Sequence, residues 1–214
     1  MILTIRDCSL AFRAFYSPPR AFERSRLNGF ASRLLEQFGL NTLQPKDLVL
    51  DSGDQLYRYA LRATLYNGLM IFSLSAQTAD ANFNRLVRRA DRTLAVNCLH
   101  TMIEACNDGL SDECYAEAGV NAAFASPEER RKFFSQRVTN GIDSAGILAY
   151  KQVGGPNQLV RLEIDQSWAY PDAAYLVWKT IGMRLNEAME LKTDQVWTSV
   201  FDLMRPFDLE FVDE

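Results

Sequence analysis

Residues 59–76 contain the feature that most restricts the fold, an Asn-Gly pair between two apolar runs. Asn-Gly is the preferred pair for a two-residue type I′ hairpin turn, because both central residues need φ > 0. Counting outward from the turn matches four apolar or aromatic residues with four on the other side, and a side-chain period of two places all eight on one face. The predicted pairs are Leu65–Met70, Ala63–Phe72, Leu61–Leu74 and Tyr59–Ala76. A slip of one residue would destroy this match, so the pattern predicts the hairpin and its register.

The rest of the first half reads as a strand, a helix, this hairpin and a second helix. Residues 1–15 alternate like a strand, but the apolar positions change phase near Asp7, which predicts a β-bulge. Residues 21–38 have apolar side chains near helical spacing, and Gly39 ends the run. Residues 81–107 carry an apolar stripe and predict one long helix.

The second half gives a similar order of elements. Residues 115–124 predict a strand, and Ser126-Pro127-Glu128-Glu129 is a capping box with proline at the first helical position. That helix is expected to reach about residue 140. A second hairpin is predicted from residues 147–153 and 158–166, and helices from 172–191 and 194–204.

Both halves therefore predict the order β-α-β-β-α, which is that of a ferredoxin-like unit. The expected fold class is α+β, with duplicated units and helices packed on one face of antiparallel sheet. We place the first unit at residues 1–109 and the second at 110–214, where an acidic C-terminal tail follows. Element order alone links the two units, and it leaves open whether they form one continuous sheet or two.

Several classes of protein lack support in the sequence. No segment approaches the roughly 18 consecutive apolar residues of a membrane helix, and residues 1–6 do not resemble a secretory signal, so we expect a cytoplasmic protein that does not enter a membrane. The four cysteines show no C-x-x-C spacing, which favours buried reduced thiols over a zinc site. Neither a P-loop nor a G-x-G-x-x-G motif is present, so no cofactor is expected.

Two further patterns bear on catalysis. His100 is the only histidine, and its helical neighbours include no obvious nucleophile, so a half-buried structural histidine is the favoured interpretation. Glu163 and Asp165 project from one face of a predicted strand and form a carboxylate pair that magnesium would accept. A solvated strand face beside Arg161 accounts for the same pattern.

Charge is distributed unevenly along the chain. Residues 1–107 hold 13 Lys and Arg against 9 Asp and Glu, a net charge of +4, whereas residues 108–214 hold 10 against 18, a net charge of −8. In the predicted long helix, four arginines at i, i+3, i+4 and i+7 form one stripe, and two more share the polar face of the first hairpin. These candidate partner-binding residues are Arg85, Arg88, Arg89, Arg92, Arg58 and Arg62.

Arginine at this density is suited to bidentate contacts with carboxylate or phosphate. The sequence therefore predicts a non-enzymatic interaction protein that binds an acidic protein partner or a second copy of itself. Residues 207–214 alternate apolar and acidic side chains and are expected to add a strand to a sheet edge, its own or a neighbour's. Two alternatives stay open: an RNA-binding or RNA-processing protein with a duplicated ferredoxin-like fold, and a metal-dependent hydrolase that uses Glu163 and Asp165.

Overall fold

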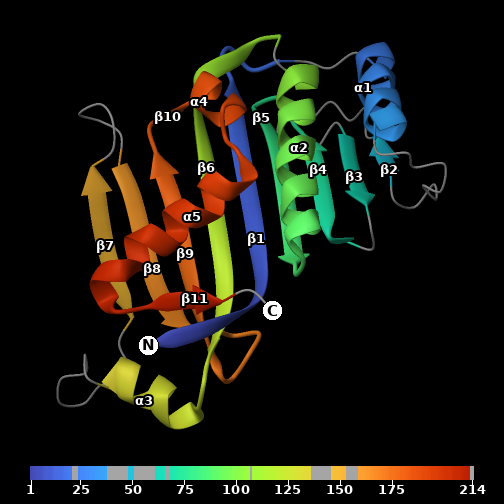
Figure 1. Cartoon of the computed structure of the whole chain (residues 1–214). Coiled ribbons are helices and arrows are strands. Elements are labelled where there is room, and N and C mark those ends of the chain that lie inside the picture. The colour runs from blue at the N-terminus through green and yellow to red at the C-terminus, as the bar shows by residue number, and fades with distance from the viewer. Residues whose placement is uncertain are drawn as a thin grey trace.

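The fold was analysed in a computed structural model of the whole chain (Figure 1). The structure describes residues 1–20, 24–37, 48–50, 61–65, 68–106, 108–135, 146–152 and 159–212. Within these ranges, none of the helices combines the length and the apolar character that a membrane crossing requires.

The described strands form one large sheet with the order β2-β3-β4-β5-β1-β6-β9-β8-β7. Its centre is the antiparallel pair of β1 (Ile2–Tyr16) and β6 (Leu110–Phe124), which are in register from Leu3 opposite Phe124 to Tyr16 opposite Leu110. This pairing joins the two halves of the chain into one continuous sheet, which answers the question that the sequence left open.

The first half builds one wing of the sheet. Its strands are β2 (Leu48–Leu50), β3 (Leu61–Leu65), β4 (Met70–Leu74) and β5 (Thr78–Leu86), and β5 returns to pair with β1. Helices α1 (Arg24–Gln37) and α2 (Arg89–Cys106) lie in front of this wing (Figure 1).

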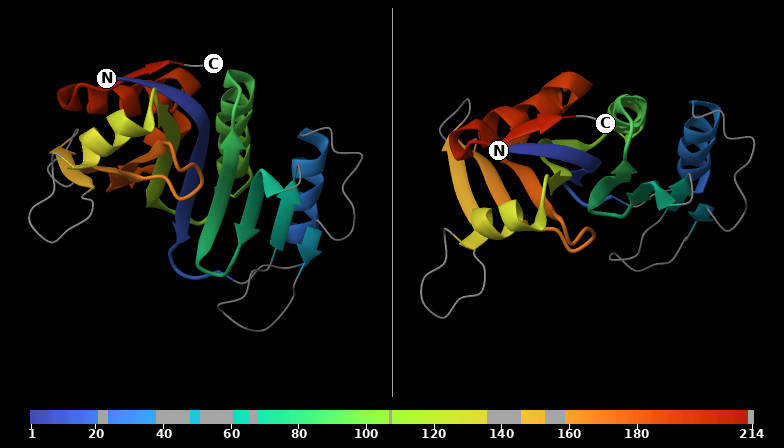
Figure 2. Two further views of the ribbon diagram at one scale, coloured as in Figure 1. Left: turned by 90° about the horizontal axis from the view of Figure 1, so that it is seen from below. Right: turned by 60° about the horizontal axis from the view of Figure 1, so that its bottom comes forward.

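The second half builds the other wing from β7 (Ile147–Gln152), β8 (Leu159–Gln166) and β9 (Ala173–Ile181), and β9 pairs with β6. The short strand β10 (Met183–Arg184) also pairs with β6. Helices α4 (Leu185–Met189) and α5 (Thr193–Met204) lie on the same side of the sheet as α2, and α3 (Pro127–Ser135) follows the end of β6 (Figures 1 and 2). The opposite face of the sheet carries no described helix.

The first hairpin has the predicted register. Leu61 is opposite Leu74, Ala63 opposite Phe72 and Leu65 opposite Met70, and all six side chains are buried. The fourth predicted pair involves Tyr59, which lies outside the described residues, as do Tyr66 and Asn67 of the turn. Gly68 has φ of 88°, a backbone conformation that glycine adopts without steric cost.

The predicted irregularity in the first strand is also confirmed. The register of β1 shifts between Ile5 and Asp7 against β6, and between Cys8 and Leu10 against β5. Leu3 and Ile5, which precede the bulges in the sequence, and Leu10 and Phe12, which follow them, are all buried. The bulges therefore account for the change of phase in the apolar pattern.

Two predicted helices are wrong over part or most of their length. The helix expected at 81–107 begins only at Arg89, because residues 78–86 form β5. Phe83 and Leu86 looked like a helical i, i+3 pair, but both face the core from a strand: they oppose Leu10 and Cys8, so β5 holds one extra residue there. Arg85, in this bulge, has φ of 54°. A bulge thus reproduces the spacing of a helix.

The helix expected at 172–191 is mostly β9, and only Leu185–Met189 is helical. Residues of β9 are buried on both faces, including Leu176 and Trp178 on one side and Val177 on the other. A strand buried on both faces reads as a continuous apolar run, and periodicity alone does not distinguish it from a helix. As a result, the first half has the order β-α-β-β-β-β-α, with two strands more than the ferredoxin-like order β-α-β-β-α, and the second half also has additional strands, so that assignment is not confirmed.

The other predictions for the second half fit the structure. Ser126 caps α3 by accepting a hydrogen bond from the Glu129 backbone N–H, with an Oγ–N distance of 3.1 Å. The residues beyond Ser135, where this helix was expected to continue, lie outside the described residues until Gly146. Strands β7 and β8 pair as the second hairpin, and α5 covers the last predicted helix.

The C-terminal segment adds a strand to the chain's own sheet. Strand β11 (Glu210–Val212) follows a 3-10 helix at Arg205–Phe207 and runs parallel to the first residues of β1. The N-terminal ammonium of Met1 donates a hydrogen bond to the Asp208 carbonyl over 2.6 Å, and the Glu210 N–H donates to the Met1 carbonyl over 2.9 Å. The two termini therefore lie side by side.

Candidate binding surface

The arginines predicted to form one helical stripe are separated by the true start of α2. Arg85 is exposed at the end of β5, Arg88 is exposed just before the helix, and Arg89 is its first residue and also exposed. Arg92 faces the core with 4% of its surface exposed, and its guanidinium lies 3.7 Å from the Cys8 sulfur. The stripe is wrong because the interpretation assumed helical geometry for residues that form a strand and a turn.

The two hairpin arginines lie apart from this group. Arg62 is exposed on the helix-free face of β3, opposite Ser73 of β4. Arg58 lies outside the described residues.

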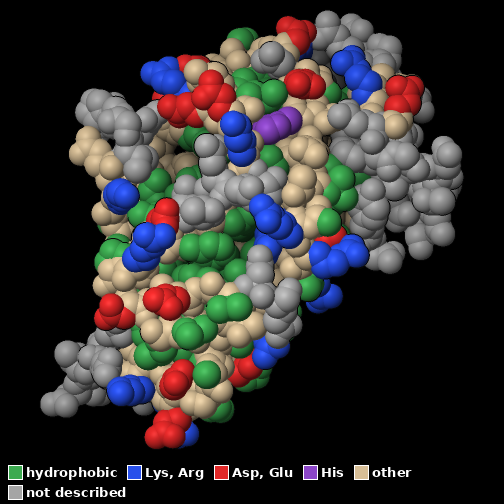
Figure 3. Space-filling model, viewed as in Figure 1, with side chains coloured by type: hydrophobic (Ala, Val, Ile, Leu, Met, Phe, Trp, Pro, Cys, Tyr) green, Lys and Arg blue, Asp and Glu red, His purple; other side chains and the backbone are tan. Residues whose placement is uncertain are grey.

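Arg85, Arg88 and Arg89 nonetheless remain together at the junction between β5 and α2. Figure 3 shows Lys and Arg side chains gathered over the N-terminal end of α2. Asp91 organises this junction: its carboxylate accepts hydrogen bonds from the Arg88 guanidinium at 2.8 Å and from the Arg88 backbone N–H at 3.1 Å. The hydrogen bond from Arg88 holds the pKa of Asp91 below its usual value.

A loop from the other half of the chain reaches the same end of the sheet. Residues 167–172 connect β8 to β9, and Trp168 within them is 99% exposed, whereas Trp178 and Trp197 are 6% and 4% exposed. Full exposure of the largest apolar side chain is costly in water. An exposed tryptophan on an ordered loop is therefore a candidate contact residue.

A buried polar network holds this loop in place. Asp7, 6% exposed at the bulge of β1, accepts hydrogen bonds from the Tyr170 hydroxyl at 2.8 Å and from the Asn121 side-chain amide at 2.7 Å. The Asn121 oxygen accepts a hydrogen bond from the Ser167 hydroxyl at 2.7 Å. Ser167 in turn accepts from the backbone N–H groups of Ala169 and Tyr170 at 3.2 and 3.1 Å. The residues before and after Trp168 are thus held by hydrogen bonds, which fix the backbone of the loop at this position.

The loop and the arginines are neighbours. The hydrogen bond to Asp7 raises the pKa of the Tyr170 hydroxyl, and the guanidinium groups of Arg85 and Arg6 oppose this rise electrostatically. Arg6 also forms an ion pair with Asp172 at 3.4 Å. We group the loop residues Trp168 and Tyr170 with Arg6 and the junction arginines Arg85, Arg88 and Arg89 under the name Trp168 surface, in which Tyr170 connects the loop to Arg6 and Arg85.

The predicted carboxylate pair lies elsewhere, on the helix-free face of the sheet. Glu163 is flanked by two cations: Arg161 at 2.5 Å and Lys179 of β9 at 3.6 Å. Lys179 also contacts Glu117 of β6 at 3.4 Å, so the charges form a row across three strands. Asp165 is exposed and accepts a hydrogen bond from the Gln166 backbone N–H at 2.7 Å. Glu163 is already compensated by protein cations, which favours a structural role.

The remaining candidates for chemistry are isolated. No group of three or more His, Cys, Asp and Glu side chains is placed to hold a metal ion in the described part of the chain. His100 is half-buried on α2, and its Nε2 has no hydrogen-bond partner there. All four cysteines are buried and none forms a disulfide, and burial raises the pKa of the Cys98, Cys106 and Cys114 thiols to about 12.

Sequence reasoning found three arginines of the Trp168 surface but missed its aromatic residues. The signal was the segment Ser-Trp-Ala-Tyr-Pro at 167–171, which has the composition of a loop and directly follows a well-patterned strand. Because a helix was predicted from residue 172, these residues were not identified as a loop between two strands.

Comparison with known proteins adds no functional assignment. No protein-family model matches the chain, and no curated protein sequence matches it significantly.

Proposed function

We propose that this protein binds an acidic partner protein through the Trp168 surface. The observation that carries the proposal is the 99% exposure of Trp168 on a loop fixed by the Asp7 network, in which Tyr170 is influenced by the exposed Arg6 and Arg85. Tryptophan and arginine are the residue types most enriched among the energetically dominant contacts of protein interfaces.

Burial of Trp168 and the rigidity of its loop both favour binding. Burying a large aromatic side chain removes about 150–250 Å² from water, which corresponds to about 4–6 kcal/mol before the costs of association. Because the loop is already ordered on both sides of Trp168, little additional ordering is needed on binding. Arginines around such an anchor select acidic partners and accelerate their association.

The arrangement favours a protein over a nucleic acid. Single-stranded nucleic acids are bound by a basic groove with several aromatic platforms for successive bases, whereas one tryptophan is 99% exposed here. The carboxylates of Asp91 and Asp172 are interleaved with the arginines, and a continuous line of phosphates would have to pass them. An acidic protein can place its carboxylates between such groups.

A second copy of the chain is the simplest acidic partner, because the half from residue 108 onward has a net charge of −8. The tail route to self-assembly has less support, since β11 already pairs with β1 of its own chain. Sedimentation at low and high salt separates self-association from binding of another protein.

The binding test uses a short fluorescein-labelled peptide rich in glutamate and phenylalanine, with a labelled single-stranded oligonucleotide as comparison. We expect Trp168→Ala to weaken peptide binding by about thirtyfold, in the range of a dominant interface contact. Arg85→Gln with Arg88→Gln should weaken it by about tenfold at low salt and much less at high salt. Fluorescence anisotropy measures both effects.

Two matched controls accompany these variants. Tyr150→Ser removes another aromatic side chain that is 57% exposed, and Arg205→Gln removes another exposed arginine that is ion-paired with an aspartate. Both should bind the peptide like the original chain. Equal binding by the Trp168→Ala variant, or tighter binding of the oligonucleotide than of the peptide, would refute the proposal.

We also propose that the two halves are related by internal duplication, in a form other than ferredoxin-like. Each half begins with a 15-residue strand, continues with a helix and a meander, and returns its last meander strand beside the first. The orders β2-β3-β4-β5-β1 and β7-β8-β9-β6 support this correspondence. The Trp168 surface combines residues from both halves.

A further inference from the structure

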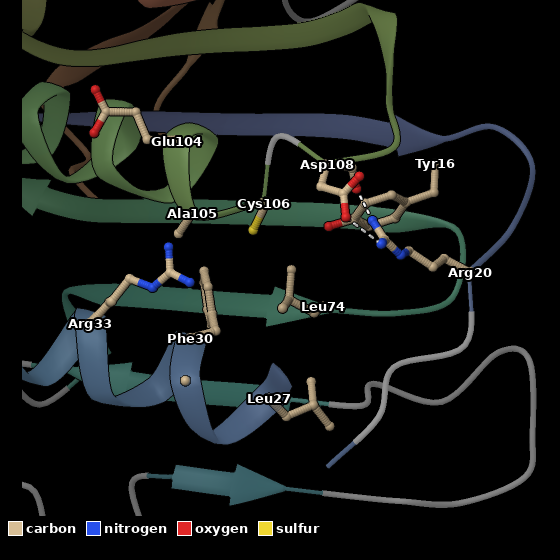
Figure 4. Close-up of a pocket in the computed structure, with 11 residues that line it drawn as sticks. Tyr16, Arg20, Leu27, Phe30, Arg33, Leu74, Glu104, Ala105, Cys106 and Asp108 are labelled. Atoms are coloured by element: carbon tan, nitrogen blue, oxygen red, sulfur yellow. Dashed lines mark hydrogen bonds and ion pairs between the residues drawn. The ribbon is translucent and has the colours of Figure 1, made fainter. Parts of the chain in front are cut away.

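The first wing contains a cavity that the Trp168 surface does not use. It lies between α1 and α2 over β4, with a volume of about 510 Å³ (Figure 4). Small-molecule sites in proteins commonly measure about 300–1,000 Å³. The size therefore suits a small organic ligand.

The apolar side of the cavity comes from well-packed residues. Leu27 and Phe30 of α1 and Leu74 of β4 line it, and they are 2%, 5% and 2% exposed. Their burial in the core fixes their positions before any ligand arrives. Gly29 also lines the cavity, and a Cβ atom added there would meet no described atom within 4 Å.

Most polar groups of the lining are neutral or already paired. Arg20 forms an ion pair with the Asp108 carboxylate at 2.6 Å and donates a second hydrogen bond to the Asp108 carbonyl. Burial raises the pKa of the Cys106 thiol to about 12 and also raises that of the Tyr16 hydroxyl, so both groups are uncharged at neutral pH.

Arg33 differs from these groups. Figure 4 shows its guanidinium extending from α1 across the cavity toward Ala105 and Cys106, while the carboxylate of Glu104 points away from the cavity. No ion pair of Arg33 with another described residue is present in the structure. The cavity thus offers one unpaired guanidinium above an apolar wall.

We propose that this cavity binds a small organic monocarboxylate with an apolar body. The carboxylate pairs with the Arg33 guanidinium, whose planar fork matches two carboxylate oxygens. The apolar body lies against Leu27, Phe30 and Leu74. One free guanidinium compensates a single negative charge, and Asp108 and Glu104 near the rim disfavour anions of higher charge.

The test uses a series of straight-chain carboxylates from acetate to octanoate, together with the matching primary alcohols, titrated by calorimetry into the full chain. We expect affinity to rise by about fourfold per methylene until the cavity is filled. The carboxylates should bind about tenfold more tightly than the alcohols of equal length.

Two variants locate the site. Arg33→Gln should abolish the preference for carboxylate over alcohol while leaving the dependence on chain length. Gly29→Leu should abolish binding of both series by filling part of the cavity, and its thermal stability should equal or exceed that of the original chain, because leucine is favoured over glycine inside a helix. Trp168→Ala should bind octanoate normally, which separates this site from the Trp168 surface.

Absence of saturable octanoate binding at millimolar concentration would overturn the proposal. Unchanged octanoate affinity in Gly29→Leu, or an unchanged preference for carboxylate in Arg33→Gln, would overturn it as well.

Discussion

Arg85 has a backbone conformation that lowers the stability of the fold and a guanidinium that we propose for binding. Its φ of 54° belongs to the left-handed region, which costs a side-chain-bearing residue about 1 kcal/mol relative to glycine. The strain is the consequence of the bulge that lets both Phe83 and Leu86 face the core. Arg85 is also exposed, and its guanidinium opposes the rise in the pKa of the Tyr170 hydroxyl in the loop that carries Trp168.

We expect Arg85→Gly to raise the free energy of unfolding by up to about 1 kcal/mol and to weaken binding of the acidic peptide. Arg88→Gly, at the neighbouring exposed arginine outside the left-handed region, should show no such gain. Chemical denaturation measures stability, and anisotropy measures binding. A loss of stability in Arg85→Gly would contradict this account of the bulge.

Individual residues also show how much of the candidate site can be predicted from the sequence. The arginines were predicted from charge and helical spacing; Arg85, Arg88 and Arg89 are exposed in the structure, whereas Arg92 is buried. The importance of Trp168 lies in its exposure, and exposure depends on packing between segments that are far apart in sequence. Asp7 and Asn121, which hold its loop, are 114 residues apart.

At the scale of elements, the predictions succeeded where local rules decide the structure. The apolar pattern around Asn-Gly predicted the register of β3 and β4, and the capping box marked the start of α3. They failed at β5 and β9, where a bulge and a doubly buried strand imitate helical spacing. Because β5 was predicted as part of a helix, the arginines were assigned to one helix. Because β9 was predicted as a helix, the loop of residues 167–172 was not identified.

The loop of residues 167–172 is an element held mainly by its polar contacts, so it has its own test. Asp7→Ala leaves the Tyr170 hydroxyl and the Asn121 amide without their acceptor, which should cost about 1–3 kcal/mol of stability. We expect faster hydrogen exchange in residues 167–172 than in β3, which is far from the change. Arg62→Ala, an exposed control on β3, should affect neither measurement. Unaltered exchange in the loop would show that Asp7 does not hold it.

At the scale of the whole molecule, the sheet carries both proposed sites on one continuous frame. Strands β1 and β6 join the wings, and the Trp168 surface takes arginines from the first half and its aromatic residues from the second. The cations of this surface therefore come from the first half and its aromatic side chains from the second.

The buried thiols predict how the stability of the whole chain depends on pH. Cys98, Cys106 and Cys114 have pKa values of about 12 in the folded state, against an ordinary value of 9.0. Between these values the unfolded chain binds fewer protons than the folded one, so stability falls as pH rises from about 9 to about 12. Each thiol contributes up to about 1.4 kcal/mol per pH unit. Urea denaturation across this range should show the decline, and Cys98→Ala should reduce its slope. An equally steep decline in that variant would contradict the assignment.

The most direct test of the central claim is quenching of tryptophan fluorescence by iodide and by caesium, each normalised to a free tryptophan amide. Because Trp178 and Trp197 are buried, quenching reports on Trp168. If Trp168 and the arginines form one cationic surface, iodide will quench more strongly than caesium at low salt, and the difference will vanish at about 1 M salt and in the Arg85→Gln, Arg88→Gln variant. Equal quenching at low salt, or stronger quenching by caesium, would contradict the account.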